Sequence, residues 1–391
     1  MNLLLVTETY PPEINGVART LAQMVKGLSE LGHAVTLVRP AQKAASIHAD
    51  GDIDENEVPG LPIPGYPGLQ FGLPAYRRIT RLLDRQGIDA AYIATEGPLG
   101  YSALKACRKR GIPALTGMHT NFHQYSSHYG ASLLASGLLR YLRRFHNEAA
   151  GTLVPTVSMR NALAEDGFLN LHTWPRGVHT DLFTPARRDP QLREAWGIGP
   201  DGLAVLYVGR LAPEKNIDLA FSAFDAIRAR RADASFVLVG SGPAEDRLKI
   251  THPDALFCGP RQGCDLARHY ASADIFLFPS ETETFGNVTL EAMASGLAVV
   301  SYDLAAAHEL ILHGHSGLLA EAGSTWRFTE LAVACARNPE LQRTLKRHAR
   351  ETALQQDWPK LLVRLEQLFL AIREERVTDG IESPAESTER S

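Results

Sequence analysis

Residues 275–296, "IFLFPSETETFGNVTLEAMASG", combine an apolar strand-like run, an acidic loop and a helical segment. The run before Pro279 is typical of a buried parallel strand. Glu283 lies in the loop, and Glu291 lies in the segment of helical composition that begins near Asn287. Two carboxylates on one wall repel each other unless a cation or a hydroxyl-rich ligand lies between them. The stretch predicts a strand, loop and helix of an α/β fold, with a ligand site at the loop.

Apolar runs alternate with helical segments along the rest of the chain. The order strand, helix, strand in the first 38 residues, with Gly32 after the helix, predicts parallel strands joined by a right-handed crossover. Two such series predict two doubly wound, Rossmann-like domains that face each other across a cleft. The expected strands lie in the segments LLLVT, HAVTLV, AAYIAT, IPALTGM and GTLVPT, and then LAVLYVGR, ASFVLVG, ALFCG, DIFLFPS and LAVVSYD.

Domain limits follow from composition. We expect an N-terminal domain over residues 1–182 and a C-terminal domain over residues 183–375, with the last helix of the second free to pack back on the first domain. A proline-containing hinge is expected near residues 180–198, an irregular surface excursion over residues 48–75, and a disordered tail over residues 376–391.

Bulk composition excludes several classes of protein. The net charge of −4 gives no general attraction to nucleic acid, so an anionic ligand must meet local basic residues. The four cysteines lack a C-x-x-C pair and are expected to be reduced thiols. The N-terminus reads as a first strand rather than a signal peptide, and no apolar stretch has membrane-spanning length. A cytoplasmic protein is expected, without a metal or another cofactor.

Basic residues follow an expected strand in "VLYVGRLAPEKNID", residues 205–218. Arg210 lies at the end of this strand and Lys215 lies five residues later. A guanidinium and an ammonium group suit a diphosphate, although a surface arginine and a lysine near a helix start would give the same pattern. In the opening stretch, the free amides around Gly286 suit a ligand oxygen at a helix N-terminus, whereas an ordinary cap with a solvated Glu291 is the alternative.

These segments together resemble a known family. "GRLAPEKN" and "PSETETFGNVTLEAMASG" are similar to the two signature stretches of the family 4 glycosyltransferases, which are retaining enzymes of the GT-B fold. Glu283 and Glu291 match the two glutamates of that family's E-x7-E motif. "TETYPPEINGVARTL", "TGMHTNFHQY" and "PRGVHTDLF" match as well, so the resemblance covers roughly residues 1–370.

The resemblance implies roles for individual residues. Arg210 and Lys215 would bind the donor diphosphate, and Glu291 would bind the ribose hydroxyls. Glu283 would hold the transferred sugar, so that hydroxyl groups lie between the two carboxylates. His119 would hydrogen-bond the sugar beside its anomeric carbon. The implied site comprises, as catalytic residues, His119, Glu283, Arg210 and Lys215, and, as donor-binding residues, Gly16, Arg210, Lys215, Arg261, Glu283, Phe285, Gly286, Asn287 and Glu291.

Other features leave alternatives open. Gly16 would approach the donor, or it is a plain loop glycine. The loop lacks the G-x-G-x-x-G fingerprint of a dinucleotide site.

The histidines and the acidic run could suggest a metal site. His119 and His123 are four residues apart, but no acidic third ligand is nearby, so no metal site is expected; His123 and Tyr125 would line the cleft. The D-x-D spacing in "DGDIDENE" is expected to be a solvated acidic turn. "FCGPRQGCD" would meet the base through Arg261, without distinguishing guanine from uracil.

Two N-terminal helices are basic and amphipathic: "AYRRITRLLDR" and "ASLLASGLLRYLRRFHNEAA". They would dock on anionic lipid or pack on the sheet with solvated arginines. Further on, "DLAAAHEL" is less glycine-rich than the family's usual form before Glu309, the expected helix glutamate.

The leading function is transfer of a hexose, most simply mannose from GDP-mannose, to a lipid or glycan acceptor. The wording is closest to bacterial GDP-mannose-dependent α-mannosyltransferases and glycolipid glycosyltransferases. A UDP-glucose, UDP-galactose or UDP-glucuronate enzyme acting on a glycolipid such as diacylglycerol is the alternative. A UDP-amino-sugar epimerase, a non-catalytic sugar-nucleotide-binding protein and an oxidoreductase are less consistent with these motifs.

Overall fold

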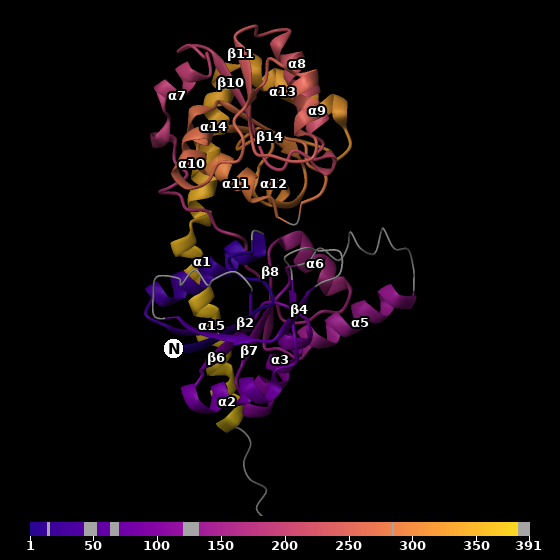
Figure 1. Cartoon of the computed structure of the whole chain (residues 1–391), viewed down its shortest axis with the longest axis vertical. Helices are drawn as coiled ribbons and strands as arrows, with labels where there is room; N and C mark the ends of the chain where they lie inside the picture. Colours follow the sequence, from indigo (N-terminus) through magenta and orange to yellow (C-terminus); the bar gives the residue numbers. More distant parts are fainter. Residues whose placement is uncertain (14–15, 43–52, 63–69, 120–132, 284, 382–391) are drawn as a thin grey trace, which may run out of the picture. The chain divides into compact units, whose positions relative to one another are not determined.

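The computed structural model describes residues 1–13, 16–42, 53–62, 70–119, 133–283 and 285–381. The chain forms two compact units. Unit 1 comprises Met1–Pro175 and Pro359–Ser391, and unit 2 comprises Arg176–Trp358 (Figure 1). The expected boundary at residue 182 was therefore placed too late, because residues 176–182 belong to unit 2.

Unit 1 is built, within the described residues, on a seven-stranded parallel sheet in the order β3-β2-β1-β6-β7-β8-β9. Leu4 of β1 lies between Thr36 of β2 and Ala91 of β6. Strand order reverses between β1 and β6, which is the topological switch point of this sheet. The strands are β1 (Asn2–Val6), β2 (Ala34–Pro40), β3 (Asp54–Val58), β6 (Ala90–Ile93), β7 (Ala114–Gly117), β8 (Gly151–Val154) and β9 (Leu171–Thr173).

Helices connect these strands, and the last helix of the chain joins them. A Cβ atom at Gly27 of α1 would come within 2.0 Å of Leu362 of α15, so a glycine lets these two helices pack closely (Figure 1). The helices are α1 (Gly16–Glu30), α2 (Tyr76–Gln86), α3 (Pro98–Arg110), α5 (Leu133–Asn147), α6 (Val157–Glu165) and α15 (Trp358–Ile381). Helix α15 extends to Ile381, so the expected disorder from residue 376 is wrong up to that residue, and residues 382–391 lie outside the described ranges.

The expected irregular excursion contains regular structure. Strand β3 pairs with β2, and β4 (Gly60–Pro62) pairs antiparallel with β5 (Gln70–Gly72). The side chain of Arg39 in β2 is only 2% exposed and forms ion pairs with Glu55 and Glu57 of β3. Residues 54–57 of the acidic run were therefore wrongly predicted as a solvated turn, because a buried guanidinium needs these carboxylates, while residues 50–52 lie outside the described ranges.

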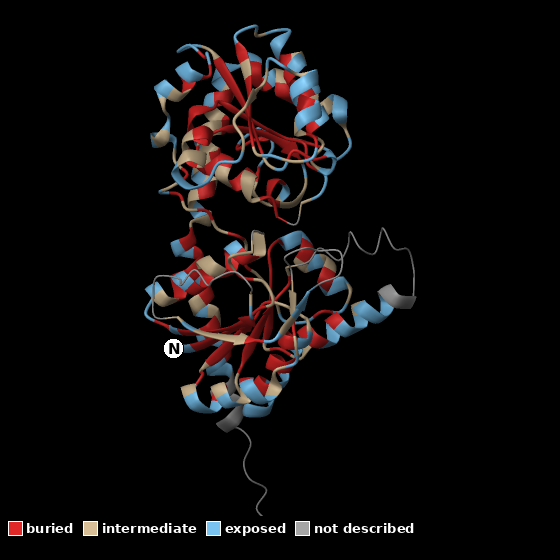
Figure 2. Cartoon of the chain, in the orientation of Figure 1, coloured by how far each residue is buried: buried red, intermediate tan, exposed pale blue. Residues whose placement is uncertain are grey.

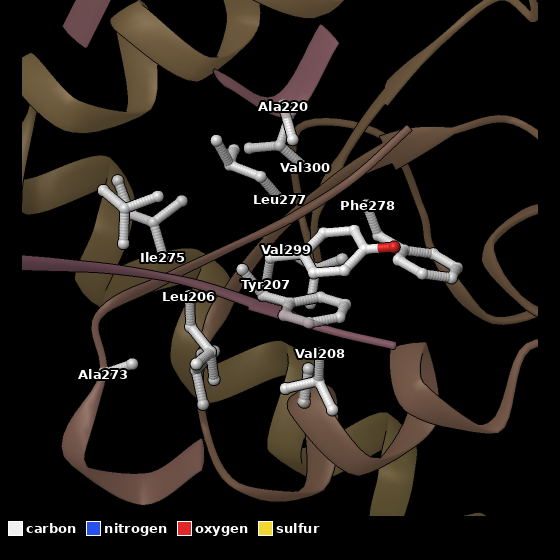
Figure 3. Packing of buried hydrophobic residues seen from close by; sticks show 14 of the residues in the cluster. Leu206, Tyr207, Val208, Ala220, Ala273, Ile275, Leu277, Phe278, Val299 and Val300 are labelled. Carbon is white, nitrogen blue, oxygen red and sulfur yellow. The ribbon is translucent and has the colours of Figure 1, made fainter. Parts of the chain in front are cut away.

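Unit 2 has, within the described residues, a six-stranded parallel sheet in the order β12-β11-β10-β13-β14-β15. Its switch point lies between β10 and β13. Tyr207 of β10 packs beside Phe278 of β13, with ring centroids 6.1 Å apart (Figure 3). The strands are β10 (Leu203–Val208), β11 (Ala234–Val239), β12 (Leu256–Phe257), β13 (Ile275–Phe278), β14 (Ala298–Tyr302) and β15 (Leu318–Ala320).

Most residues of the central strands of both sheets are buried, and exposed residues line the outer faces of the helices (Figure 2). This burial on both faces explains why the strands read as continuous apolar runs. In unit 2 the helices are α7 (Pro190–Ala195), α8 (Ile217–Arg228), α9 (Glu245–Thr251), α10 (Gly263–Ser272), α11 (Asn287–Ala294), α12 (Ala305–Leu310), α13 (Thr325–Arg337) and α14 (Pro339–Ala353), with the short 3-10 turns η1 (Pro185–Arg187), η2 (Pro213–Lys215) and η3 (Leu354–Gln356).

The hinge expected over residues 180–198 is wrong. This segment contains η1 and α7 and is anchored to unit 2 by Arg188 and Arg193, whose guanidinium groups lie 2.9 and 3.0 Å from the Asp274 carboxylate. The chain instead passes between the units at residues 175–176 and again at residues 358–359. Prolines and charges resemble a linker in the sequence, but here the charges are paired against the body of unit 2.

Candidate active site

The basic and acidic candidates of unit 2 meet at its switch point. Arg210 and Lys215 follow β10, and Glu283 follows β13, the strand next to β10 in the sheet. Ligands of open α/β sheets bind outside the carboxyl ends of the strands at such a point. The sequence prediction therefore places these three residues at the edge where a ligand is expected.

Lys215 and Glu283 form a close pair. The Lys215 ammonium lies 2.6 Å from Glu283 Oε1 and donates to the Thr282 carbonyl at 3.0 Å. The Ser280 hydroxyl donates to the same Glu283 oxygen at 2.9 Å. An ammonium has three N–H donors, so one remains for a ligand. Glu283 Oε2, in turn, accepts no hydrogen bond from the described residues, so it can receive one from a hydroxyl group.

Burial strengthens this pair. The side chains of Lys215 and Glu283 are 19% and 17% exposed, so water screens their attraction less than it would at the surface. The partners of Glu283 also help to explain how two carboxylates can lie in one short segment. Glu283 is balanced by Lys215 and Ser280, while Glu291 has a partner of its own. Each carboxylate is thus stabilised even without hydroxyl groups between them.

Glu291 is held by a buried tyrosine. The Tyr270 hydroxyl, at the C-terminal end of α10, donates to Glu291 Oε2 at 3.0 Å. Burial, reinforced by the Glu291 charge, raises the pKa of Tyr270 well above its usual value, so the hydroxyl remains a donor. The Tyr270 ring packs edge-on against Phe183. A rigid phenol therefore fixes the orientation of the Glu291 carboxylate.

The N-terminus of α11 has the backbone geometry that the sequence predicts. Gly286 has φ +87°, in the left-handed region that favours glycine. Phe285 is 1% exposed and anchors the loop in the core of unit 2, while Asn287 begins the helix. The Asn287 Oδ1 atom is buried without a hydrogen-bond partner in the described part of the chain. The loop is thus fixed at its base, and its amides remain near the positive end of the helix dipole.

Two arginine candidates lie in more open positions. Arg210 is paired with Glu214 at 3.2 Å, and its side chain is 65% exposed. Arg261 donates to the Cys258 carbonyl at 2.9 Å and to Asp265 at 3.0 Å, with 41% of its side chain exposed. Both guanidinium groups keep donors that face solvent, so both can meet an anion or a base without breaking the fold.

In unit 1, His119 lies two residues after the end of β7. Its Nε2 atom lies 2.9 Å from the hydroxyl of Tyr92, a buried residue of β6. A Cβ atom at Gly117 would come within 2.1 Å of that hydroxyl and 2.6 Å of His119 Nε2, so only glycine leaves room for this contact. Gly16 is the first residue of α1. His123 and Tyr125 lie outside the described residues.

Helix α12 carries Glu309 in a half-buried position. Ala305, which begins this helix, has φ +51°, a conformation that glycine adopts more easily. The alanine-rich segment therefore keeps the backbone that a glycine would favour. Its departure from the family pattern leaves strain at this turn.

The sequence analysis did not identify the residues that orient the candidate side chains through hydrogen bonds. Tyr92, Tyr270 and Ser280 each orient one candidate side chain. Tyr92 and Tyr270 lie more than twenty residues from their partners, in segments whose composition is that of ordinary core, so only the fold reveals their contacts. Across the described ranges, no group of three or more His, Cys, Asp or Glu residues is arranged to hold a metal ion.

Comparison with known proteins supports the resemblance. A model described as Glycosyltransferase Family 4 matches residues 14–182, and one described as Glycosyl transferases group 1 matches residues 202–338. A protein of Mycobacterium tuberculosis named GDP-mannose-dependent alpha-mannosyltransferase is 32% identical over 97% of this chain and 99% of its own length. The alpha-monoglucosyldiacylglycerol synthase of Streptococcus pneumoniae is 26% identical over 77% of this chain and 71% of its own.

Solved structures share the fold. Anabaena HepE in complex with UDP superposes with a TM-score of 0.76 at 19% identity, covering 95% of this chain and 100% of that chain. This likeness supports the predicted GT-B fold, with a parallel sheet in each of two Rossmann-like units. The motifs, the parallel sheet of each unit and the relative that matches the chain almost end to end agree, and the chain belongs to the family 4 glycosyltransferases.

Proposed function

We propose that this enzyme transfers mannose from GDP-mannose to a hydroxyl group of a lipid or lipid-linked glycan. The observation that carries the proposal is the Lys215–Glu283 pair at the switch point of unit 2, which combines a cation for phosphate with a carboxylate for sugar hydroxyls. The choice of donor is supported by the name of the Mycobacterium tuberculosis relative, which matches along almost the whole chain.

The donor would use the contacts that the described residues leave open. The free N–H of Lys215, the exposed guanidinium of Arg210 and the amides at the start of α11 bind the diphosphate. Glu291, oriented by Tyr270, would accept hydrogen bonds from the ribose, and Arg261 would meet the base. These cations stabilise the negative charge that grows on the diphosphate in the transition state, which is usually the largest electrostatic contribution to catalysis.

Transfer would proceed on one face of the sugar. The bond between the anomeric carbon and the diphosphate oxygen breaks, and its electron pair leaves with the diphosphate. The acceptor oxygen bonds to the anomeric carbon on the same face, and its proton passes to the departing phosphate. Glu283 Oε2 holds a sugar hydroxyl during this step. The products are GDP and an α-mannoside.

The runner-up is a UDP-sugar donor, favoured by the name of the Streptococcus pneumoniae relative. Calorimetric titration of the purified chain with GDP-mannose, UDP-glucose, UDP-galactose and UDP-glucuronate separates the two. We expect GDP-mannose to bind at least tenfold more tightly than any UDP-sugar. Tighter binding of a UDP-sugar would overturn the mannosyl assignment while leaving the family intact.

The reaction would need no metal ion, because Lys215 and Arg210 supply the positive charge at the diphosphate. Turnover after dialysis against EDTA should equal turnover in Mg²⁺ or Mn²⁺. Loss of activity in EDTA that is restored by one of these ions would contradict this proposal.

Contact with a membrane would be peripheral, at its cytoplasmic face. None of the helices in the described ranges combines the length and apolar composition that a bilayer span requires. Helix α2 buries Ile79 and Leu83 and exposes Arg77, Arg78 and Arg81, so its basic face is open to anionic headgroups. The chain should float with phosphatidylglycerol vesicles and not with phosphatidylcholine vesicles. Equal flotation with both, or with neither, would contradict electrostatic docking.

A further inference from the structure

The switch point of unit 1 carries a second pair of carboxylates. Glu8 follows β1 and Glu96 follows β6, the two strands between which the strand order reverses. This is the place in an open parallel sheet where a ligand crevice is expected. Neither residue takes part in the donor contacts of unit 2.

Glu8 is fixed by the backbone at the start of α3. Its carboxylate accepts a hydrogen bond from the Leu99 N–H at 3.2 Å, and its own N–H donates to Thr95 Oγ1 at 3.2 Å. A Cβ atom at Gly97 would lie 2.2 Å from both carboxylate oxygens, so glycine makes room for them. Burial, and to a smaller extent the charge of Glu96, raises the pKa of Glu8 to about 7. The carboxyl group thus lies in a setting that favours added hydrogen-bond donors.

Glu96 directly faces a buried histidine. Glu96 Oε1 and His146 Nε2 are both buried without a hydrogen-bond partner in the described part of the chain, and they lie 3.5 Å apart. The His146 side chain is fully buried, and its other ring nitrogen lies 2.8 Å from Thr116 Oγ1. A buried polar atom without a partner costs about 1–3 kcal/mol, so such a pair calls for an explanation.

Two partly exposed tyrosines lie on helices that contact Glu8 and Glu96. Tyr101 in the first turn of α3 is 42% exposed, and Tyr141 of α5 is 39% exposed. The Tyr141 hydroxyl donates to the Glu96 carbonyl, which fixes its ring beside that residue. Burial first, and then the charges of Glu96 and Glu8, raise the pKa of Tyr141, so these groups lie within reach of one another.

Carboxylates beside exposed aromatic rings suit a carbohydrate. An ionised carboxylate is an acceptor with two oxygens, which matches a pair of neighbouring hydroxyl groups. The face of a sugar ring that carries C–H groups packs against an aromatic ring, whose surface is apolar while its hydroxyl stays polar. A diacylglycerol has one free hydroxyl and no such ring, so it would use little of this surface.

We propose that Glu8, Glu96, Tyr101 and Tyr141 form an acceptor subsite that binds the sugar or cyclitol headgroup of the acceptor. Glu8 and Glu96 receive neighbouring hydroxyl groups of the headgroup, and the tyrosines contact its ring. This inference rests on the proposed function and narrows its acceptor to a glycosylated or cyclitol-bearing lipid. The subsite selects the acceptor and leaves donor binding to unit 2.

The test uses the full chain with GDP-mannose and three defined probes: octyl α-D-mannopyranoside, octyl α-D-glucopyranoside and 1,2-dioctanoyl-sn-glycerol. We expect transfer to at least one octyl glycoside at a kcat/KM at least tenfold higher than to dioctanoylglycerol. Glu8→Gln and Glu96→Gln should each raise the KM for that glycoside by about tenfold or more, the effect of one lost charge-assisted hydrogen bond. Tyr101→Ala, a change at a partly exposed ring, should raise it about fivefold.

Controls separate this subsite from folding and from the donor site. Glu165→Gln, at an exposed glutamate of α6, should leave the KM unchanged. All variants should bind GDP-mannose in calorimetry as the wild type does. If the wild type does not bind GDP-mannose, the proposed function has failed. If it binds the donor but prefers dioctanoylglycerol, uses no octyl glycoside, or shows a KM within twofold of wild type in both glutamine variants, the acceptor subsite is overturned.

Discussion

The carboxylates at the two switch points of this enzyme differ in the partners that the protein gives them. In unit 2, Glu283 receives an ammonium and a hydroxyl on one oxygen, and Glu291 receives the Tyr270 phenol. In unit 1, Glu8 has a raised pKa, and Glu96 Oε1 is buried without a hydrogen-bond partner in the described residues. The same sheet topology therefore supports one edge with paired charges and one edge where Glu8 accepts backbone N–H donors alone and Glu96 Oε1 has no donor from the described residues.

This difference indicates a division of labour. Paired groups are preorganised and need no rearrangement when charge develops on a diphosphate. Carboxylates without a charged partner and with few donors gain most from a ligand rich in hydroxyl groups, because the ligand supplies the missing hydrogen bonds. We therefore assign the charged donor to unit 2 and the polyol headgroup to unit 1. The predictions below test each half of this comparison.

The largest effect on the stability of unit 2 should come from Asp274, the residue before β13. Its carboxylate contacts Arg188, Arg193 and Lys346 at 2.9–3.1 Å and accepts the Ala204 N–H. Removing one partner of a buried ion pair costs about 3–5 kcal/mol, so Asp274→Asn should lower the free energy of unfolding by that amount. Denaturant unfolding measures the loss, with the exposed Asp246→Asn as the control. A change below 1 kcal/mol would contradict this role.

The same residue predicts how stability depends on pH. Although burial raises the pKa of Asp274, the charges of Lys346 and Arg188 lower it to about 2, from a usual value of 3.8. A lowered carboxyl pKa gives stability that is complete above pH 3.8 and is lost as pH falls toward 2. Asp274→Asn should lose this part of the acid dependence, which unfolding measured between these values would show.

Catalysis should depend strongly on the paired cation of unit 2. Lys215→Ala removes a charge from the diphosphate and leaves Glu283 without its cation, so we expect kcat to fall about 10²–10³-fold, as for loss of one preorganised donor. Initial rates of GDP release measure this. Lys249→Ala, which removes an exposed ammonium paired with Glu245, should retain wild-type rates. Lys215→Ala at more than a tenth of the wild-type rate would show that the pair does not stabilise the leaving group.

Loss of the hydrogen bond that orients Glu291 should have a smaller effect, on the affinity for the donor. Tyr270→Phe keeps the packed ring but removes the hydroxyl that donates to Glu291. Loss of one such hydrogen bond costs about 0.5–1.5 kcal/mol, so the Kd for GDP-mannose should rise roughly 3–10-fold. Calorimetry measures this, and Tyr76→Phe, in unit 1, should match the wild type. An unchanged Kd would mean that Glu291 needs no preorganisation.

We expect the smallest effect when backbone strain at Ala305 in unit 2 is relieved. Ala305 has φ +51°, which costs a non-glycine residue roughly 1–2 kcal/mol. Ala305→Gly relieves this strain but makes the unfolded chain more flexible, so a net gain of about 0.5–1 kcal/mol in unfolding free energy is expected. Thermal unfolding would detect it. A loss of stability would show that the methyl group contributes packing that exceeds the strain.

Much of this molecule could be predicted from its sequence. Each expected strand segment contains a strand, because parallel strands buried on both faces read as apolar runs. Lys215, Glu283 and Glu291 could be named because they lie in short local motifs. Strands β9 and β15 were not expected, since three residues are too few to give a pattern.

The errors and omissions have physical causes. Strand β3 is polar because it lies at a sheet edge and its glutamates pair with Arg39, so its composition resembles a loop. The segment over residues 180–198 looks like a linker until Asp274 is found beside its arginines. Glu8 and Glu96 are 88 residues apart in sequence and share no motif. Only the sheet order brings them to one switch point.

Calorimetric titration of GDP-mannose into three proteins tests the division of labour most directly: the wild type, Glu291→Gln, and a double variant carrying Glu8→Gln and Glu96→Gln. We predict that Glu291→Gln weakens donor binding by about tenfold, as loss of a charged acceptor does, and that the double variant binds the donor like the wild type. If the double variant loses donor affinity while Glu291→Gln keeps it, the assignment of the two switch points is wrong.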